Sequence, residues 1–156
     1  MNEIKASANQ RKRPTRVFLS HSSDDTTLAQ KIRDLLFRRL GFQVFMNEDL
    51  SAGENWQSKL RKQLESADAF VALLTPASVA DSWVLQETGA AWALKKTIIP
   101  LVTRLELLDR FPIQLRSYPA LDLKDLDTPA GSKRFTEAVE QTLAAEHVST
   151  QFTYFK

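Results

Sequence analysis

Cysteine is absent from this 156-residue chain. Its absence excludes a disulfide framework and a thiolate metal site, and it favours a reducing compartment, so we expect a cytoplasmic protein. Histidine is nearly absent as well, since His21 and His147 are the only two. Two histidines are too few for a histidine-built centre, and we expect no metal. No apolar run approaches the roughly 20 residues of a membrane span, so we expect neither a membrane helix nor a signal peptide.

Glycine is scarce, and the chain has four: Gly41, Gly53, Gly89 and Gly131. None of them forms the G-x-G-x-x-G fingerprint of dinucleotide-binding folds or the glycine-rich Walker loop. A G-x-S-x-G nucleophile elbow is missing too. These absences exclude a Rossmann dehydrogenase, a P-loop NTPase and an α/β-hydrolase.

Charge is nearly balanced, with a formal net charge of +2. Much of the excess lies near the start of the chain, at Lys5, Arg11, Lys12, Arg13 and Arg16. No aromatic residue interrupts this basic stretch for base stacking, so we expect no direct nucleic-acid partner. From length and composition we predict a flexible basic leader over residues 1–14, a single globular domain over 15–147 and a C-terminal tail over 148–156.

The hydropathy pattern alternates between short apolar runs and amphipathic stretches. The runs predict strands at residues 16–20, 42–45, 69–74, 97–102 and 120–123. The amphipathic stretches predict helices at residues 25–40, 56–66, 82–96 and 132–146, with a less regular segment at 105–117. This alternation is typical of an α/β protein with a parallel sheet covered by helices on both faces. We predict a flavodoxin-like, three-layer fold with five strands in the order 2-1-3-4-5.

The stretch from Ser82 to Lys96 is predicted to be a helix capped by Ser82. Between Asp81 and Lys95, Glu87 is its one charged residue. Because apolar side chains stand nearly all round this helix, we expect it to be buried on every side. By the three-and-four spacing, the residues on one face are Trp83, Glu87, Ala90, Ala91 and Leu94.

Glu87 needs an explanation on such a surface, because a buried carboxylate must be paired with a cation, hydrogen-bonded or shifted in pKa. It is either a satisfied structural acid or a catalytic carboxylate in a cleft. In a sheet of order 2-1-3-4-5, ligands bind at the carboxyl ends of the strands, between the first and third strands. The helix begins just after the third predicted strand, so Glu87 can face that crevice, which favours the catalytic interpretation.

Four acidic residues border the same crevice: Asp24, Asp25, Glu48 and Asp49. Acidic pairs at these loops also occur in flavodoxin-like phosphate receivers. The strand at 97–102 lacks the lysine that a receiver uses, which argues against that function.

Four motifs in order resemble a Toll/interleukin-receptor (TIR) domain. They are R-V-F-L-S-H-S-S-D-D from residue 16, G-F-Q-V-F-M-N-E-D-L-S-A-G-E-N-W from residue 41, F-V-A-L-L-T-P-A-S-V from residue 70 and W-V-L-Q-E from residue 83. The resemblance covers residues 16–146 and implies the flavodoxin-like fold. In this family many animal domains are assembly scaffolds, whereas bacterial, plant and axon-degeneration members cleave NAD with the glutamate of a W-x-x-x-E pattern. That pattern runs from Trp83 to Glu87, so the resemblance implies that Glu87 is the catalytic carboxylate.

The resemblance also implies substrate contacts from Ser20, His21, Ser22 and Trp83. For each of these, a structural role stays open: a cap for the serines, a solvated loop for His21 and core packing for Trp83. The loop at residues 46–55 matches the family's mobile loop, which gates the cleft and makes assembly contacts, and implies contacts from Leu50 and Gly53. Family enzymes often place arginine or lysine near these loops for the pyrophosphate, where this chain has Ser22, Ser23, Glu48, Asp49 and Glu54. Phosphate contacts would then come from backbone amides, from Lys59 or Arg61, or from a neighbouring subunit.

NAD suits a site with one acid, because nicotinamide is already cationic and leaves as a neutral molecule without protonation. A lone carboxylate can hold the ribose hydroxyls and stabilise the oxocarbenium-like transition state. The expected function is therefore an NAD glycohydrolase or cyclase, with NAD as substrate and no cofactor, in immune or anti-phage signalling. Expected partners are other TIR domains in a homo-oligomer or filament, and a fused or separate sensor module. The alternatives are a catalytically silent TIR adaptor and a nucleoside-processing enzyme of related topology.

Overall fold

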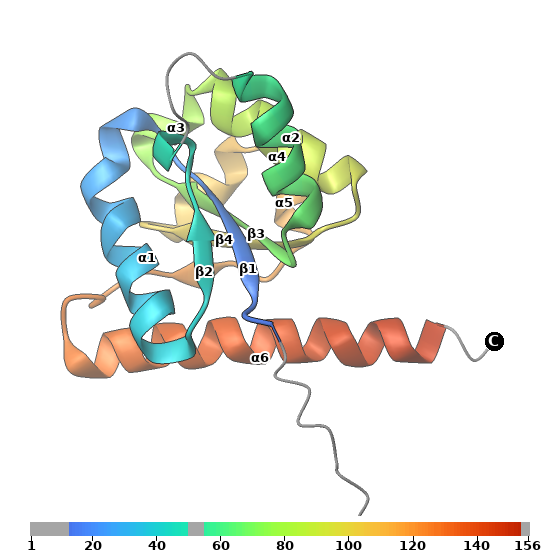
Figure 1. The fold of residues 1–156 in the computed structure, drawn as a ribbon. Helices are drawn as coiled ribbons and strands as arrows, with labels where there is room; N and C mark the ends of the chain where they lie inside the picture. The colour runs from blue at the N-terminus through green and yellow to red at the C-terminus, as the bar shows by residue number, and fades with distance from the viewer. Residues whose placement is uncertain (1–12, 50–54, 154–156) are drawn as a thin grey trace, which may run out of the picture.

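A central parallel sheet organises the chain in the computed structural model, which describes residues 13–49 and 55–153 (Figure 1). Its strands are β1 (Arg16–Ser20), β2 (Gln43–Phe45), β3 (Ala69–Leu74), β4 (Thr97–Val102) and β5 (Leu121–Asp122). They pair in the order β2-β1-β3-β4-β5, and every pair is parallel. This confirms the predicted flavodoxin-like sheet and its strand order.

Helices connect the strands and cover both faces of the sheet (Figure 1). The α-helices are α1 (Thr26–Leu40), α2 (Trp56–Ser66), α3 (Pro76–Val79), α4 (Ser82–Ala93), α5 (Ile113–Arg116) and α6 (Pro129–Thr153). Three short 3-10 helices are η1 (Ser23–Asp25), η2 (Asn47–Asp49) and η3 (Leu105–Arg110). The last helix is longer at both ends than the predicted 132–146, and residues 76–79, for which no helix was predicted, form the helical turn α3.

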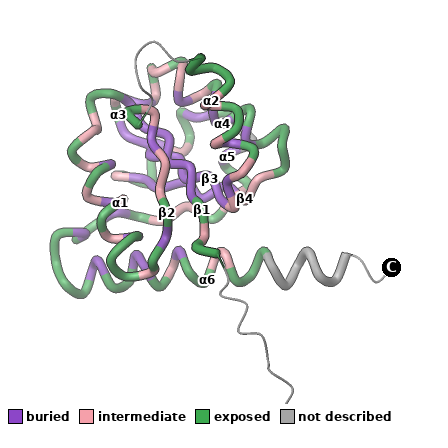
Figure 2. Tube along the Cα trace, in the orientation of Figure 1, coloured by how far each residue is buried: buried purple, intermediate pink, exposed green. Residues whose placement is uncertain are grey.

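Side chains along the central strands point alternately to two separate cores. Along β3, for example, Val71 packs in one core and Phe70 in the other. The first core is closed by α1 and α6, and the second by α2, α4, α5 and η3. Because both faces are covered, every residue of β3 is buried, which explains why its sequence is a continuous apolar run (Figure 2).

Burial of α4 is one-sided, so the prediction that this helix is buried all round is wrong. Its buried residues are Val84, Glu87, Thr88 and Ala91. These positions follow the three-and-four spacing of a single stripe that faces the sheet. On the other side, Trp92 is 51% exposed, and Leu94, which follows the helix, is 45% exposed. The predicted face was wrong for Ala90 and Leu94, because a helix without a polar side offers no pattern that identifies its outer surface.

The ends of the helices are set by capping groups. Asp81, and not the predicted Ser82, caps α4, because its carboxylate accepts hydrogen bonds from the backbone N–H groups of Trp83 and Val84. Gly41 ends α1 in the left-handed conformation, with φ at 69°, and its N–H donates to the carbonyl of Phe37. In the described part of the chain, no helix combines the length and apolar character needed to cross a bilayer.

The conformation of Gly41 generates a stability test. Apart from the adjacent backbone, no heavy atom would lie within 4 Å of a Cβ added at Gly41 or at the helical Gly89, so backbone conformation decides both outcomes. Gly41→Ala should lower the free energy of unfolding by about 1 kcal/mol, because alanine is strained at positive φ. Gly89→Ala, the matched control, should raise it by up to about 1 kcal/mol through helix propensity. Urea denaturation measures both, and a shift of the two variants in the same direction would contradict this account.

Candidate functional site

Three elements meet around Glu87 at the carboxyl ends of β1 and β2. Ser20 is the last residue of β1, and its hydroxyl donates a hydrogen bond of 3.0 Å to Glu87 Oε1. Asn47 begins η2, directly after β2 and Met46, and its Nδ2 donates a hydrogen bond of 3.0 Å to the same oxygen. The structure therefore brings the predicted Ser20 and Glu87 together and adds Asn47, which sequence reasoning did not identify.

The second carboxylate oxygen of Glu87 has a different environment. Oε2 is buried and has no hydrogen-bond partner among the described residues. The whole residue is 4% exposed, and no ion pair is recorded for it in the described structure. A carboxylate in such a setting is poorly solvated, which makes its protonated form easier to populate.

Burial away from water raises the pKa of the Glu87 carboxyl from its ordinary 4.5 to about 7. The hydrogen bonds from Asn47 and Ser20 act in the opposite direction, and the nearby charge of Asp81 raises the pKa further. Both protonation states of Glu87 are therefore populated near neutral pH. Strongly shifted acids of this kind concentrate at functional sites.

His21 directly follows Ser20 in the chain. It is 6% exposed, so the alternative of a solvated loop histidine is wrong. Its Nδ1 lies 2.7 Å from the carbonyl oxygen of Ser22, and because a carbonyl can only accept, Nδ1 carries the hydrogen. Nε2 lies 3.3 Å from a carboxylate oxygen of Glu48.

Buried polar atoms without hydrogen-bond partners gather at this site. Of the four such side-chain atoms in the described structure, Glu87 Oε2 and Asn47 Oδ1 belong to one hydrogen-bonded pair. The other two are His21 Nε2, which lies 3.3 Å from Glu48, and the hydroxyl oxygen of Thr103. Each unpaired buried group costs about 1–3 kcal/mol, so their concentration in one place marks a site that a polar ligand can complete. Asn47 Oδ1 is an acceptor, and so is Oε2 of ionised Glu87, so a matching ligand presents hydroxyl or amide hydrogens to them.

Trp83 is half-buried at the start of α4, one turn before Glu87. Its ring packs against Trp56, with ring centroids 5.4 Å apart and planes inclined by 49°. Trp56 is 43% exposed, so the pair is an aromatic surface and not part of a closed core. Trp56 was predicted only as the start of the helix at 56–66, and its place directly after the loop at residues 46–55 is the signal that could have identified it.

The other predicted contacts have mixed outcomes. Ser22 is buried and caps η1, since its hydroxyl oxygen accepts a hydrogen bond from Asp24 N at 3.4 Å. Leu50 and Gly53 lie outside the described residues.

The acids near the crevice are held by separate partners, with Asp25 accepting from Thr75 and Asp49 pairing with Arg33. Over residues 13–49 and 55–153, no cluster of three or more His, Asp or Glu side chains is arranged to hold a metal ion.

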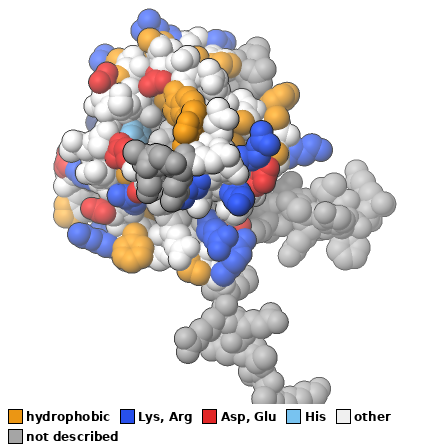
Figure 3. Space-filling view, turned by 45° about the horizontal axis from the view of Figure 1, so that its top comes forward, with side chains coloured by type: hydrophobic (Ala, Val, Ile, Leu, Met, Phe, Trp, Pro, Cys, Tyr) orange, Lys and Arg blue, Asp and Glu red, His pale blue; other side chains and the backbone are white. Residues whose placement is uncertain are grey.

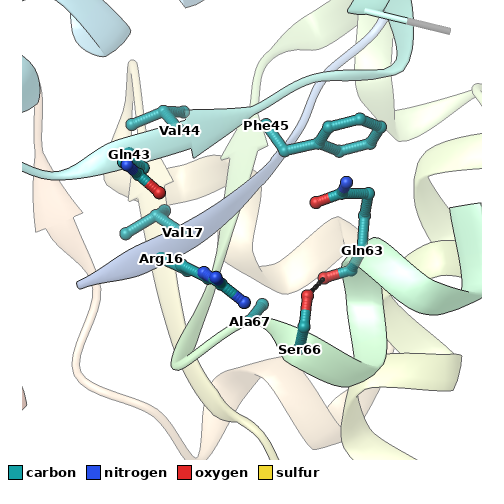
Figure 4. Close-up of a pocket in the computed structure, with 8 residues that line it drawn as sticks. All are labelled: Arg16, Val17, Gln43, Val44, Phe45, Gln63, Ser66 and Ala67. Atoms are coloured by element: carbon teal, nitrogen blue, oxygen red, sulfur yellow. Dashed lines mark hydrogen bonds between the residues drawn. The ribbon is translucent and has the colours of Figure 1, made fainter. Parts of the chain in front are cut away.

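Glu87 has little contact with solvent. A hollow of about 360 Å³ lies between β1, β2 and α2, but its lining residues, Phe45 and Gln63 among them, do not include Glu87 (Figure 4). Glu87 itself is 4% exposed, so little of its surface meets solvent in this conformation. Figure 3 turns the top of Figure 1 forward, and hydrophobic, acidic and basic side chains all reach the surface there.

Comparisons with known proteins agree on the architecture. The family model described as "TIR domain" matches residues 17–143. A Toll-related receptor TIR domain from Hydra magnipapillata is similar, with a TM-score of 0.63, 17% identity, and coverage of 81% of this chain and 96% of that one. A TIR-STING receptor from C. gigas has a TM-score of 0.63 and 22% identity, and the match covers 81% of this chain and 39% of that receptor.

A 2-deoxyribosyltransferase from Leishmania mexicana is also similar, with a TM-score of 0.56, 17% identity, and coverage of 80% of this chain and 98% of that one. At these identities the solved structures show the fold alone. Among curated proteins, no sequence matches this chain.

The raised pKa of Glu87 generates a test that needs no substrate. Because the folded-state value of about 7 lies above the ordinary 4.5, stability from this group is fully present below about pH 4.5 and is lost as pH rises through about 7. Glu87→Gln removes the titration. The variant should be more stable than the parent by roughly 3 kcal/mol at pH 8.5 and about equally stable at pH 4. Urea denaturation at several pH values measures the difference; a difference that stays constant with pH would contradict the assigned burial.

Proposed function

The chain belongs to the TIR domain family, and from this premise we propose that it cleaves the bond between nicotinamide and ribose in NAD. The products are nicotinamide and either ADP-ribose or a cyclic ADP-ribose isomer. Glu87 is the catalytic carboxylate. The proposal goes beyond the fold, which adaptors and enzymes of the family share, and depends on the chemistry of one buried acid.

The observation that carries the proposal is the asymmetry of the Glu87 carboxylate. Oε1 is held by Ser20 and Asn47, whereas Oε2 is buried and without a partner in the described structure. An acid with a purely structural role would have both oxygens satisfied or would be paired with a cation. The unsatisfied oxygen supports a role toward a ligand, and a ribose hydroxyl supplies the hydrogen that it lacks.

The reaction follows from the charges involved. The bond between C1′ and the nicotinamide nitrogen breaks with its electron pair going to the nitrogen, so nicotinamide leaves neutral and the ribose becomes cationic. Ionised Glu87 stabilises this oxocarbenium-like cation and accepts hydrogen bonds from the ribose hydroxyls. Water then adds to C1′ and releases a proton, which gives ADP-ribose. Attack on C1′ by an adenine ring nitrogen, with no water consumed, gives a cyclic isomer.

The surrounding side chains have matching roles in this proposal. The Trp56–Trp83 pair offers an apolar surface for the nicotinamide or the ribose. Nε2 of His21, which faces Glu48, becomes available to the ligand once Glu48 moves aside. Leu50 and Gly53 remain expected contacts from the loop. Because Glu87 is enclosed, NAD enters only after neighbouring side chains move, and assembly with other TIR domains would supply the cause of that movement.

The enclosure of Glu87 also favours a second candidate, a catalytically silent adaptor that acts through contacts with other TIR domains. Either function is consistent with apolar side chains exposed near the C-terminal end of α4, Trp92 and Leu94. We propose that other copies of this domain are among its partners and that the chain acts in immune signalling. Activity toward NAD separates the two candidates.

NAD turnover tests the proposal. Concentrated parent protein should release nicotinamide from NAD, as measured by chromatography, and Glu87→Ala and Glu87→Gln should each reduce the rate by about 100-fold or more. Glu137→Gln, which changes an exposed glutamate on α6, is the matched control and should retain full activity. Unchanged turnover in both Glu87 variants would reject the mechanism. No turnover by the parent, even when clustered, would favour the adaptor, and cleavage of 2′-deoxynucleosides in place of NAD would favour a nucleoside-processing enzyme.

The pH dependence of turnover provides an independent test. The ionised carboxylate is the active form, and its pKa is about 7. The rate should therefore reach half its plateau near pH 7 and fall about tenfold per pH unit well below that value. A rate that stays constant down to pH 5 would show that no group with the pKa of Glu87 controls the reaction.

A further inference from the structure

Asn47 is the one residue of η2 that contacts Glu87 by a recorded hydrogen bond. Its neighbours fix its position from both sides. Met46 is fully buried, and its N–H donates a hydrogen bond of 2.8 Å to Asp49, which in turn pairs with Arg33 of α1 at 3.1 Å. Glu48 accepts a hydrogen bond of 2.8 Å from Thr26. The turn is therefore tied to α1, and Asn47 is directed toward α4.

The orientation of the Asn47 amide is set by the hydrogen bond from its nitrogen to Glu87, because its oxygen has no hydrogen-bond partner among the described residues. Nδ2 donates to Glu87 Oε1, whereas Oδ1 is buried without a hydrogen-bond partner in the part of the chain that the structure describes. The opposite orientation would place the amide oxygen against the carboxylate and repel its ionised form. A structural asparagine would satisfy both ends of its amide, so this geometry indicates a role toward the carboxylate.

We propose that Asn47 is a positioning residue, which holds Oε1 of Glu87 together with Ser20 so that Oε2 is the oxygen that meets the substrate. The inference rests on the proposed function for its catalytic meaning, but its geometry can be tested without NAD. Two donors from two different elements fix the rotation of one carboxylate more tightly than either donor alone. With Oε1 occupied by donors, a proton taken up by Glu87 is expected on Oε2, where it blocks the oxygen that the ligand needs.

The hydrogen bond from Asn47 helps to keep Glu87 ionised near neutral pH. Donation from Asn47 favours the charged form and lowers the pKa of Glu87, against the larger effect of burial. Asp81 at the N-terminus of α4 is the charged group that acts on this carboxylate, whereas His21 after β1 and Glu48 in η2 contact each other. Asp81 raises the pKa of Glu87. No Lys or Arg in the described part of the chain lowers the pKa of Glu87 in return. Loss of the Asn47 hydrogen bond should therefore move the titration of Glu87 to higher pH.

NMR titration of the full chain, with glutamate labelled at the side-chain carboxyl carbon, tests this inference without substrate. The Glu87 signal is the one that disappears in Glu87→Gln. In Asn47→Ala the midpoint of this signal should rise by about one pH unit, because a hydrogen bond to a charged group has been lost. Asn47→Asp, which keeps the shape of the side chain, should raise it at least as far, because two adjacent carboxylates resist ionising together. Gln86→Ala, which removes an exposed amide of α4, is the control and should leave the midpoint unchanged.

An unchanged midpoint in Asn47→Ala and Asn47→Asp would overturn the inference, whatever the activity of the protein. If NAD is cleaved, the rate of Asn47→Ala should fall about three- to tenfold at pH 6.5 and recover most of the loss above pH 8.5, in step with the NMR midpoint. A rate that rises at pH 6.5 would instead show that Asn47 only closes the site, and would also overturn the positioning role. If no NAD is cleaved by the parent, the NMR result still decides whether Asn47 controls Glu87, so the two proposals fail separately.

Discussion

A carboxylate held away from water is the constraint on which the site depends. Burial raises the pKa of Glu87, and the hydrogen bonds from Ser20 and Asn47 lower it. The two effects together place the pKa at about 7. These donors come from the ends of neighbouring parallel strands, β1 and β2, and the acid comes from a helix that packs on the same sheet. The balance therefore exists only when the three elements are assembled, and no fragment of the fold could reproduce it.

The closed state of the site has a chemical consequence. A solvent-exposed glutamate would be ionised and well hydrated at neutral pH, and it would stabilise a ribose cation only weakly, because water screens the charge. An enclosed glutamate acts more strongly on a charge that develops beside it. The cost is that the ligand must displace part of the cover of Glu87, and η2 contributes to that cover through the hydrogen bond from Asn47.

Much of the fold could be predicted from the sequence because a parallel sheet covered on both faces requires continuous apolar runs, such as 69–74. Glu87 could be identified because it is the only charge in an apolar helix. Asn47 could not, since the direction of a loop side chain depends on the turn that carries it, and η2 has no pattern of its own. The exposed side of α4 was missed for a related reason: alanine, leucine and tryptophan all round a helix hide which stripe faces the core.

A crystal structure of the Glu87→Gln protein with NAD bound tests the central claim most directly. The account predicts a ribose hydroxyl within hydrogen-bond distance of the residue 87 side chain, on the side that Oε2 occupies, with Ser20 and Asn47 still on the other oxygen. NAD bound with its ribose away from residue 87, and with both side-chain atoms of that residue satisfied by the protein alone, would contradict it.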